Sequence, residues 1–278
     1  MDHFSKSSFK PRFAVTAAPY ALPGAPVLLR GEIRGQFAAA KKLCYDAIEL
    51  HLRTPDAIPA EELVSLQEEF GIQVSAVATG LAALVDHLCF ISPDAQVRMA
   101  AVERIKAFID WCSVVGCSIV LGSLRGNLPA DSSRAQAERW IQEALSSLTA
   151  YAEQKDVTLL LEVINRYENN YLNTAAETTE FVRSFHSEHL KVHLDTFHMN
   201  IEEVDMAKAI RDTGPMLGYL HLADNNRHAC GEGCLNFEAI LQALEEIGYT
   251  GYASVECLPL PDGYTAAANS LAYLKSLR

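Results

Sequence analysis

Short apolar runs alternate with amphipathic stretches along this chain, and the alternation limits its possible folds more than any other feature. A run of about four to eight apolar residues is typical of a strand buried on both faces, as in a parallel sheet covered by helices. Strand patterns that alternate with helical patterns indicate βα units. The predicted strands cover residues 13–16, 47–51, 73–77, 118–122, 159–162, 190–195, 217–221 and 252–256.

Each predicted strand is followed by a predicted helix. Proline is tolerated in the first turn of a helix, which suits Pro59, and glycine commonly follows a helix, which suits Gly71. In the third unit, a long loop through Ser92, Pro93 and Asp94 precedes the helix. The predicted helices cover residues 27–43, 59–70, 95–115, 133–154, 174–186, 205–211, 237–247 and 266–277. Eight successive βα units predict the α/β class and a single (β/α)8 TIM barrel.

The chain length also fits one barrel. Its 278 residues slightly exceed the roughly 250 of a typical (β/α)8 domain, so we expect one domain over residues 1–278. Residues 1–11 are interpreted as a flexible N-terminal extension. The alternative fold is a doubly wound open sheet, which usually carries a glycine-rich phosphate turn after its first strand. Residues 19–24 (Pro-Tyr-Ala-Leu-Pro-Gly) are no such turn, so the barrel is favoured.

Charge and composition limit the partners. A formal net charge of −12 opposes a nucleic-acid partner, because such binding depends on Lys and Arg neutralising phosphates. The sequence has no membrane-length apolar run, and its N-terminus lacks the apolar segment of a signal peptide. Seven scattered cysteines suit reduced thiols better than a disulfide framework. We therefore expect a cytoplasmic protein with neither a nucleic-acid nor a membrane partner.

Four of the predicted strands end on side chains that can bind a metal ion. They are Glu162, Asp195, His221 and Glu256, separated by 33, 26 and 35 residues. These spacings are near the length of one barrel unit, so each side chain falls at the C-terminal end of a successive strand, where barrel active sites are built. Three carboxylates and an imidazole that converge without a basic partner would repel one another. A bound divalent cation would remove that repulsion.

The four side chains also suggest which cation binds. Oxygen-rich coordination with one imidazole suits Mn²⁺ best, with Mg²⁺ and Co²⁺ as alternatives, whereas structural zinc favours thiolates and more histidines. The alternative is that each carboxylate caps a helix or pairs with an arginine, as single acids at strand ends commonly do. Four such residues on successive strands favour the metal site.

Four strings of residues carry a family resemblance. They are residues 162–168 (Glu-Val-Ile-Asn-Arg-Tyr-Glu), 194–203 (Leu-Asp-Thr-Phe-His-Met-Asn-Ile-Glu-Glu), 221–227 (His-Leu-Ala-Asp-Asn-Asn-Arg) and 254–256 (Ser-Val-Glu). They resemble the ketose 3-epimerases, of the D-tagatose or D-psicose 3-epimerase type, within the xylose-isomerase-like barrel superfamily. The similarity is strong over residues 158–261 and looser over 77–126. Residues 255–261 look like the branch that includes 5-keto-gluconate epimerases, which hints at an acidic keto-sugar.

The resemblance assigns roles to seven residues. It implies metal ligation by Glu162, Asp195, His221 and Glu256, and substrate contacts by Glu168, His198 and Arg227. The implied partner is a small ketose or keto-sugar acid, and the implied assembly is a homo-oligomer, either a dimer or a tetramer.

The reaction suggested by these residues is inversion of a sugar carbon. A metal that chelates O2 and O3 would stabilise a cis-enediolate after loss of the C3 proton. If Glu162 and Glu256 lie on opposite faces of the sugar, one removes this proton and the other returns one, which makes both residues catalytic. Return on the same face, or at C1, would make an aldose–ketose or hydroxypyruvate-type isomerase instead. An apurinic endonuclease and a non-catalytic sugar-binding barrel are the remaining alternatives.

Overall fold

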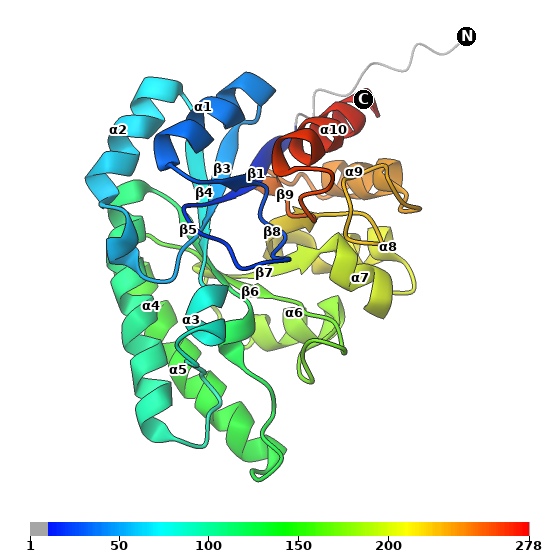
Figure 1. The fold of residues 1–278 in the computed structure, drawn as a ribbon. Coiled ribbons are helices and arrows are strands. Elements are labelled where there is room, and N and C mark those ends of the chain that lie inside the picture. The colour runs from blue at the N-terminus through cyan, green and yellow to red at the C-terminus, as the bar shows by residue number, and fades with distance from the viewer. Residues whose placement is uncertain (1–10, 278) are drawn as a thin grey trace.

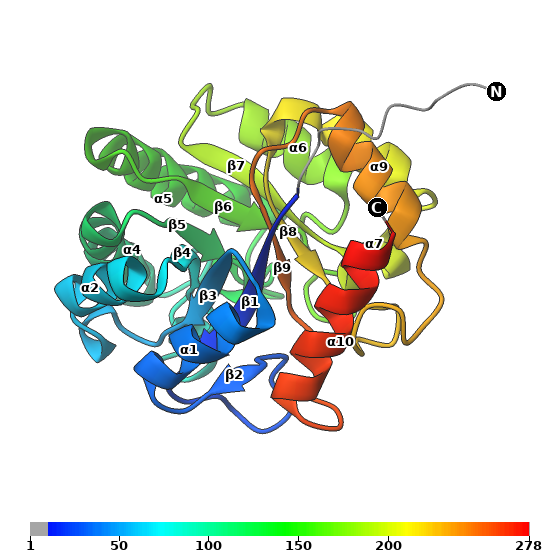
Figure 2. The ribbon, with the colours of Figure 1, turned by 90° about the horizontal axis from the view of Figure 1, so that it is seen from above.

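The computed structural model describes residues 11–277, and the sheet within them closes into a barrel of parallel strands (Figures 1 and 2). Strands β1 and β9 pair with each other and thereby close the ring. The barrel strands are β1 (Arg12–Ala18), β3 (Ala47–His51), β4 (Gln73–Ala78), β5 (Ser118–Leu121), β6 (Leu159–Glu162), β7 (Leu190–Asp195), β8 (Leu217–Leu222) and β9 (Tyr252–Val255). The predicted (β/α)8 barrel is confirmed.

The helices form a ring outside the strands, as the view in Figure 2 shows. Polar side chains begin several of them by accepting backbone N–H groups, including Asp94, Ser133 and Thr174. The helices of the ring are α1 (Ile33–Leu43), α2 (Ala60–Phe70), α4 (Ala95–Val115), α5 (Arg134–Lys155), α6 (Ala175–Arg183), α8 (Met206–Thr213), α9 (Phe237–Glu246) and α10 (Gly263–Ser276).

The first predicted helix was wrong at its start. Residues 27–43 were expected to be helical, but the helix begins at Ile33, and the short strand β2 (Leu29–Arg30) pairs with the end of β1. Gly31 follows β2 with a φ of 107°, a backbone conformation that favours glycine and breaks the chain between strand and helix. Residues 20–27, between β1 and β2, line the cavity of the candidate site at the C-terminal end of the barrel.

Two short helices were not predicted. Helix α3 (Gly80–Leu84) lies in the expected long loop before α4, and α7 (Thr196–Glu202) follows β7 directly. Both lie at the C-terminal ends of the strands, where they line or carry parts of the candidate site. Residues 1–10 of the proposed N-terminal extension lie outside the described residues.

The large hydrophobic core lies between the strands and the helices that cover them. A second, small cluster fills the inside of the barrel with Ala76, Ala78, Val120, Leu160 and Tyr219. Polar side chains continue this inner layer toward the C-terminal ends of the strands, and no part of Glu49 or His193 is exposed. The barrel interior is therefore a packed base beneath a polar site.

Within residues 11–277, every helix is too short or too polar to cross a membrane.

Candidate active site

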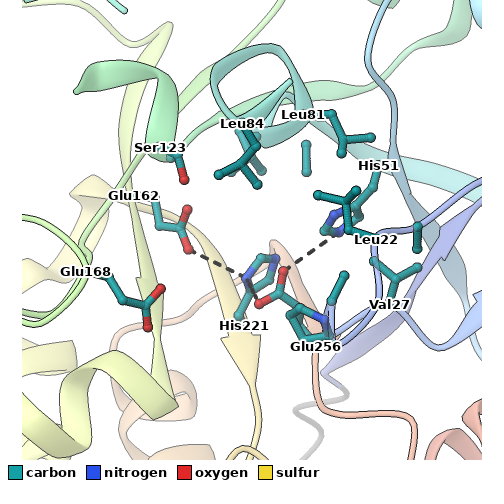
Figure 3. A pocket seen from close by; sticks show the side chains of 18 of the residues that line it. Leu22, Val27, His51, Leu81, Leu84, Ser123, Glu162, Glu168, His221 and Glu256 are labelled. Carbon is teal, nitrogen blue, oxygen red and sulfur yellow. Dashed lines mark ion pairs between the residues drawn. The ribbon is translucent and has the colours of Figure 1, made fainter. Parts of the chain in front are cut away.

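The structure brings the four predicted metal ligands together at one end of the barrel (Figure 3). Glu162 and Asp195 are the last residues of β6 and β7, His221 lies near the end of β8, and Glu256 directly follows β9. Nδ1 of His221 is 3.9 Å from Oε1 of Glu162, 3.7 Å from Oδ2 of Asp195 and 3.5 Å from Oε2 of Glu256. The three carboxylates thus surround one imidazole nitrogen.

Two buried atoms in this cluster lack the partners that such atoms require. Oδ2 of Asp195 and Nδ1 of His221 are buried, and neither forms a hydrogen bond with any described residue. The other oxygen of Asp195 accepts the backbone N–H of Phe197, so the carboxylate is held with Oδ2 facing the cluster. Buried polar atoms are rarely left unpaired. A cation among three carboxylate oxygens and one imidazole nitrogen would satisfy both atoms, and this donor set fits Mn²⁺ or Mg²⁺.

The opposite nitrogen of His221 contacts Glu49, a residue that the sequence analysis missed. Nε2 of His221 lies 2.9 Å from both oxygens of Glu49, which also accepts a hydrogen bond of 3.2 Å from Tyr219. Burial alone would raise the pKa of Glu49, but the charge and hydrogen bond of His221, with a smaller contribution from His51, hold this pKa well below its usual value. Glu49 is therefore ionised and keeps a proton of His221 on Nε2, so Nδ1 is the nitrogen that can bind a cation once its own proton has been displaced.

Charge in the cluster changes the affinity of its members for protons. Burial raises the pKa of Glu162 to about 8, helped by Glu256 and Asp195 and opposed by His221 and Arg125. Burial lowers the pKa of His221, but the charges of Glu49 and Glu256 outweigh this effect and raise it well above its usual value. At neutral pH the metal-free cluster therefore retains protons that a cation would have to displace.

His198 lies on α7 beside the cluster, with Nε2 3.9 Å from both Oε1 of Glu162 and Oδ2 of Asp195. Its Nδ1 is 2.6 Å from the amide nitrogen of Asn165. The amide oxygen of Asn165 accepts the backbone N–H groups of residues 167 and 168, so the amide NH₂ group faces the imidazole and donates to it. Burial lowers the pKa of His198. The neutral ring therefore carries its proton on Nε2 and presents a donor to the site.

Arg227 corrects the expectation that the carboxylates lack a basic partner. Nη2 of Arg227 donates a 3.2 Å hydrogen bond to Oε2 of Glu256, and Nη1 lies 3.6 Å from Oε1 of Glu168. The guanidinium also lies over the ring of Phe197, 4.7 Å from its centre. Buried Asp224 shapes the loop that carries Arg227 by accepting hydrogen bonds from the backbone N–H groups of residues 225, 231 and 235. All three predicted substrate contacts thus lie at the rim of the cluster.

A cavity of about 350 Å³ opens above the cluster. His51, also missed from the sequence, lines it, and its Nε2 lies 3.5 Å from Oε1 of Glu49 and 3.7 Å from Oε1 of Glu256. Figure 3 shows Glu162 and Glu256 approaching His221 from different sides of this cavity. Two carboxylates in such positions are suited to proton transfer at a bound molecule. A signal for both residues was present in the sequence, because Glu49 interrupts the apolar run at residues 47–51 and His51 ends it.

The barrel and its carboxylate-rich candidate metal centre define a class of (β/α)8 enzymes. Residues 37–277 match the family model described as Xylose isomerase-like TIM barrel, and the chain belongs to this family. It is 38% identical over 214 residues to the D-psicose 3-epimerase of Enterocloster bolteae, covering 73% of this chain and 68% of the relative. It is 32% identical to the L-ribulose 3-epimerase of a Methylomonas species, covering 80% and 77%.

Solved structures agree with these relatives. An L-ribulose 3-epimerase superposes with a TM-score of 0.81 at 26% identity, covering 97% of this chain and 96% of the other. The matches together place the chain among the carbohydrate epimerases, a class of isomerase.

Proposed function

We propose that this protein inverts C3 of a ketose by removing a proton from one face of the sugar and returning a proton to the other. The observation that carries the proposal is the placement of Glu162 and Glu256, whose carboxylate oxygens lie 3.9 and 3.5 Å from Nδ1 of His221 on different sides of the cavity. The names of the relatives support C3 of a ketose as the reacting carbon. In the proposal, both glutamates are catalytic residues.

Glu162, Asp195, His221 and Glu256 would hold a divalent cation, with Mn²⁺ the best fit to three carboxylates and one imidazole. When bound, the cation supplies Lewis-acid stabilisation for negative charge that develops on the substrate oxygens.

The glutamates of the chain would carry the proton. One carboxylate accepts the C3 proton, which is acidic because the neighbouring carbon is a carbonyl. The other delivers its own proton to the opposite face of the same carbon. Before the next turnover, the first carboxylate loses its proton to solvent and the second regains one.

The three residues at the rim would orient the sugar. His198 donates from Nε2 and Arg227 from its guanidinium, so both suit substrate oxygens that become negative during the reaction. Glu168 is half-exposed at the cavity and accepts hydrogen bonds, which suits a sugar hydroxyl. Water that enters the open cavity would compete for these groups, so the sugar must replace it when it binds.

A screen of free ketoses with Mn²⁺ tests the proposal, using D-psicose and L-ribulose as first substrates because relatives carry these names. The expected product is the C3 epimer, identified by NMR. Glu162→Gln and Glu256→Gln should each lower kcat by about a hundredfold or more, while ketose binding partly survives. An aldose product would identify the isomerase instead, and binding without any product would identify a sugar-binding barrel.

The proposal includes a cytoplasmic homo-oligomer without nucleic-acid partners. Sedimentation of the purified protein tests the assembly. The acidic net charge of −12 supports the absence of a nucleic-acid partner.

A further inference from the structure

We infer that the cavity selects substrates by their far end, accepting uncharged ketoses and favouring a terminal methyl group over a terminal hydroxymethyl, phosphate or carboxylate. This inference rests on the proposed function, because it concerns the same cavity. It predicts a preference for 6-deoxyketoses and departs from the acidic keto-sugar suggested by residues 255–261.

The cavity has two chemically different sides. The carboxylates, His198, His221 and Arg227 occupy one side and its floor. The other side is formed by the segment after β1 and by helix α3. We call its side chains the apolar arc: Leu22, Val27, Leu81 and Leu84. In Figure 3 Leu22, Val27 and Leu81 face Glu162 and Glu168 across the cavity, and Leu84 lies between the two sides.

This asymmetry determines how a ketose would lie. The hydrogen-bonding groups gather around the carboxylate cluster, so the carbonyl, C3 and their oxygens are placed there. The remaining carbons must then extend toward the apolar arc. A ketose held with C3 between Glu162 and Glu256 thus puts its last carbon against Leu81 or its neighbours in the arc.

The cavity offers no free cation for an anionic end group. Arg227 is the only Lys or Arg among the described residues that line it, and Glu256 and Glu168 already contact its guanidinium. Phosphates and carboxylates are usually held by arginine forks or several backbone donors. A charged end group would instead lie between an apolar surface and three glutamates. Repulsion and lost hydration both disfavour it.

The four side chains of the arc carry no hydrogen-bonding group, and Tyr20, which lines the cavity from the same segment as Leu22, is 65% exposed to solvent. His51 is the polar residue nearest to the arc in Figure 3, and its Nε2 is turned toward Glu49 and Glu256. Ser123 lies on the Glu162 side of the cavity. A hydroxymethyl group against the arc would lose water without gaining a partner, whereas a methyl group would gain apolar contact. In an apolar pocket, replacing the hydroxymethyl group by a methyl group raises kcat/KM by about tenfold.

A matched substrate series tests this inference on the wild-type protein. D-psicose, 6-deoxy-D-psicose, D-psicose 6-phosphate and the corresponding 6-carboxylate differ only at the terminal carbon. With Mn²⁺ present, we expect kcat/KM for the 6-deoxy sugar to exceed that for D-psicose by about tenfold. The two anions should fall about a hundredfold or more below D-psicose. Equal values, or a preference for either anion, would overturn the inference.

Binding of the same four compounds, measured by calorimetry, separates this inference from the proposed function. If none of the sugars is epimerised, the proposed reaction fails, but the order of the dissociation constants still decides whether the arc selects a methyl end. The 6-deoxy sugar is expected to bind most tightly and the anions most weakly. Any other order contradicts the inference.

A variant of the arc assigns the selectivity to its residues. Leu81→Asn supplies a hydrogen-bonding side chain on α3, so the preference for 6-deoxy-D-psicose over D-psicose should disappear or reverse. Val204→Asn is the matched control, because Val204 is fully exposed and is not among the residues lining the cavity. The control should keep the tenfold preference. A Leu81→Asn protein that unfolds at the wild-type temperature and keeps the full preference would refute the role of the arc.

Discussion

At the scale of single residues, the site depends on a carboxylate that touches no substrate. Glu49 is completely buried in β3, yet it contacts Nε2 of His221, Nε2 of His51 and the hydroxyl of Tyr219. A carboxylate behind a metal-binding histidine fixes the ring and makes its free nitrogen a better ligand. Glu49 is therefore a positioning residue for the candidate metal site.

Replacing Glu49 by glutamine tests this role. The amide still fills the space but can offer only one acceptor oxygen to a His221 ring that needs its proton held on Nε2. We expect the affinity for Mn²⁺, measured by electron paramagnetic resonance titration, to fall by about ten- to a hundredfold. Glu61→Gln, on the exposed face of α2, is the matched control and should bind Mn²⁺ as the wild type does. Unchanged affinity in Glu49→Gln would show that His221 does not depend on this contact.

At the scale of elements, the residue that follows β5 must lack a side chain, because the carboxylate of Glu162 at the end of the neighbouring strand β6 occupies that space. Gly122 follows β5, and a Cβ atom at this position would collide with Oε2 of Glu162. The backbone of Gly122 has a φ of −90°, so the need for glycine comes from this contact and not from a left-handed conformation.

Gly122→Ala should therefore displace the Glu162 carboxylate and lower kcat by about a hundredfold, since small misplacements of reacting groups have effects of that size. Gly35→Ala is the control, because Gly35 lies within α1 and a Cβ there meets no atom within 4 Å. The control should keep full activity and gain slightly in stability. Wild-type kcat in Gly122→Ala would show that Glu162 does not need its observed position.

The long elements could be predicted from the sequence, and the short ones could not. Helices such as α4 and α5 repeat an apolar face over several turns, whereas α3 has five residues and α7 seven, too few for a periodic pattern. The positions of Glu162, Asp195 and His221 at strand ends could be predicted from the alternation of βα units. The contact of Glu49 with His221 could not be predicted in this way, because β3 and β8 are not neighbours in the sheet. Only closure of the barrel brings these two strands together.

At the scale of the whole molecule, the candidate site joins strands from both halves of the chain. Glu49 comes from β3, while the four candidate ligands come from β6 to β9, and the pairing of β1 with β9 closes the ring between them. A cation that binds this site binds only the closed barrel, since the unfolded chain does not bring the ligands together. Metal binding should therefore stabilise the entire fold.

The melting temperature tests that coupling. Mn²⁺ at about a hundred times its dissociation constant should stabilise the protein by about 2.7 kcal/mol, or about 5 °C or more for a domain of this size. At one fixed Mn²⁺ concentration the shift should be larger at pH 9 than at pH 7, because the pKa of about 8 for Glu162 leaves a proton to be displaced at the lower pH and so weakens Mn²⁺ binding there. Asp195→Asn should lose most of the shift. A wild-type melting temperature that does not respond to Mn²⁺ would contradict the metal site.

The most direct measurement of the central claim is turnover in D₂O. If Glu162 and Glu256 exchange protons with solvent and act from opposite faces of the sugar, the epimer formed from D-psicose must carry deuterium at C3. NMR of the product with Mn²⁺-loaded protein reads this position without ambiguity. We expect one deuterium at C3 and none at C1. Formation of the epimer with hydrogen retained at C3 would contradict the two-glutamate mechanism.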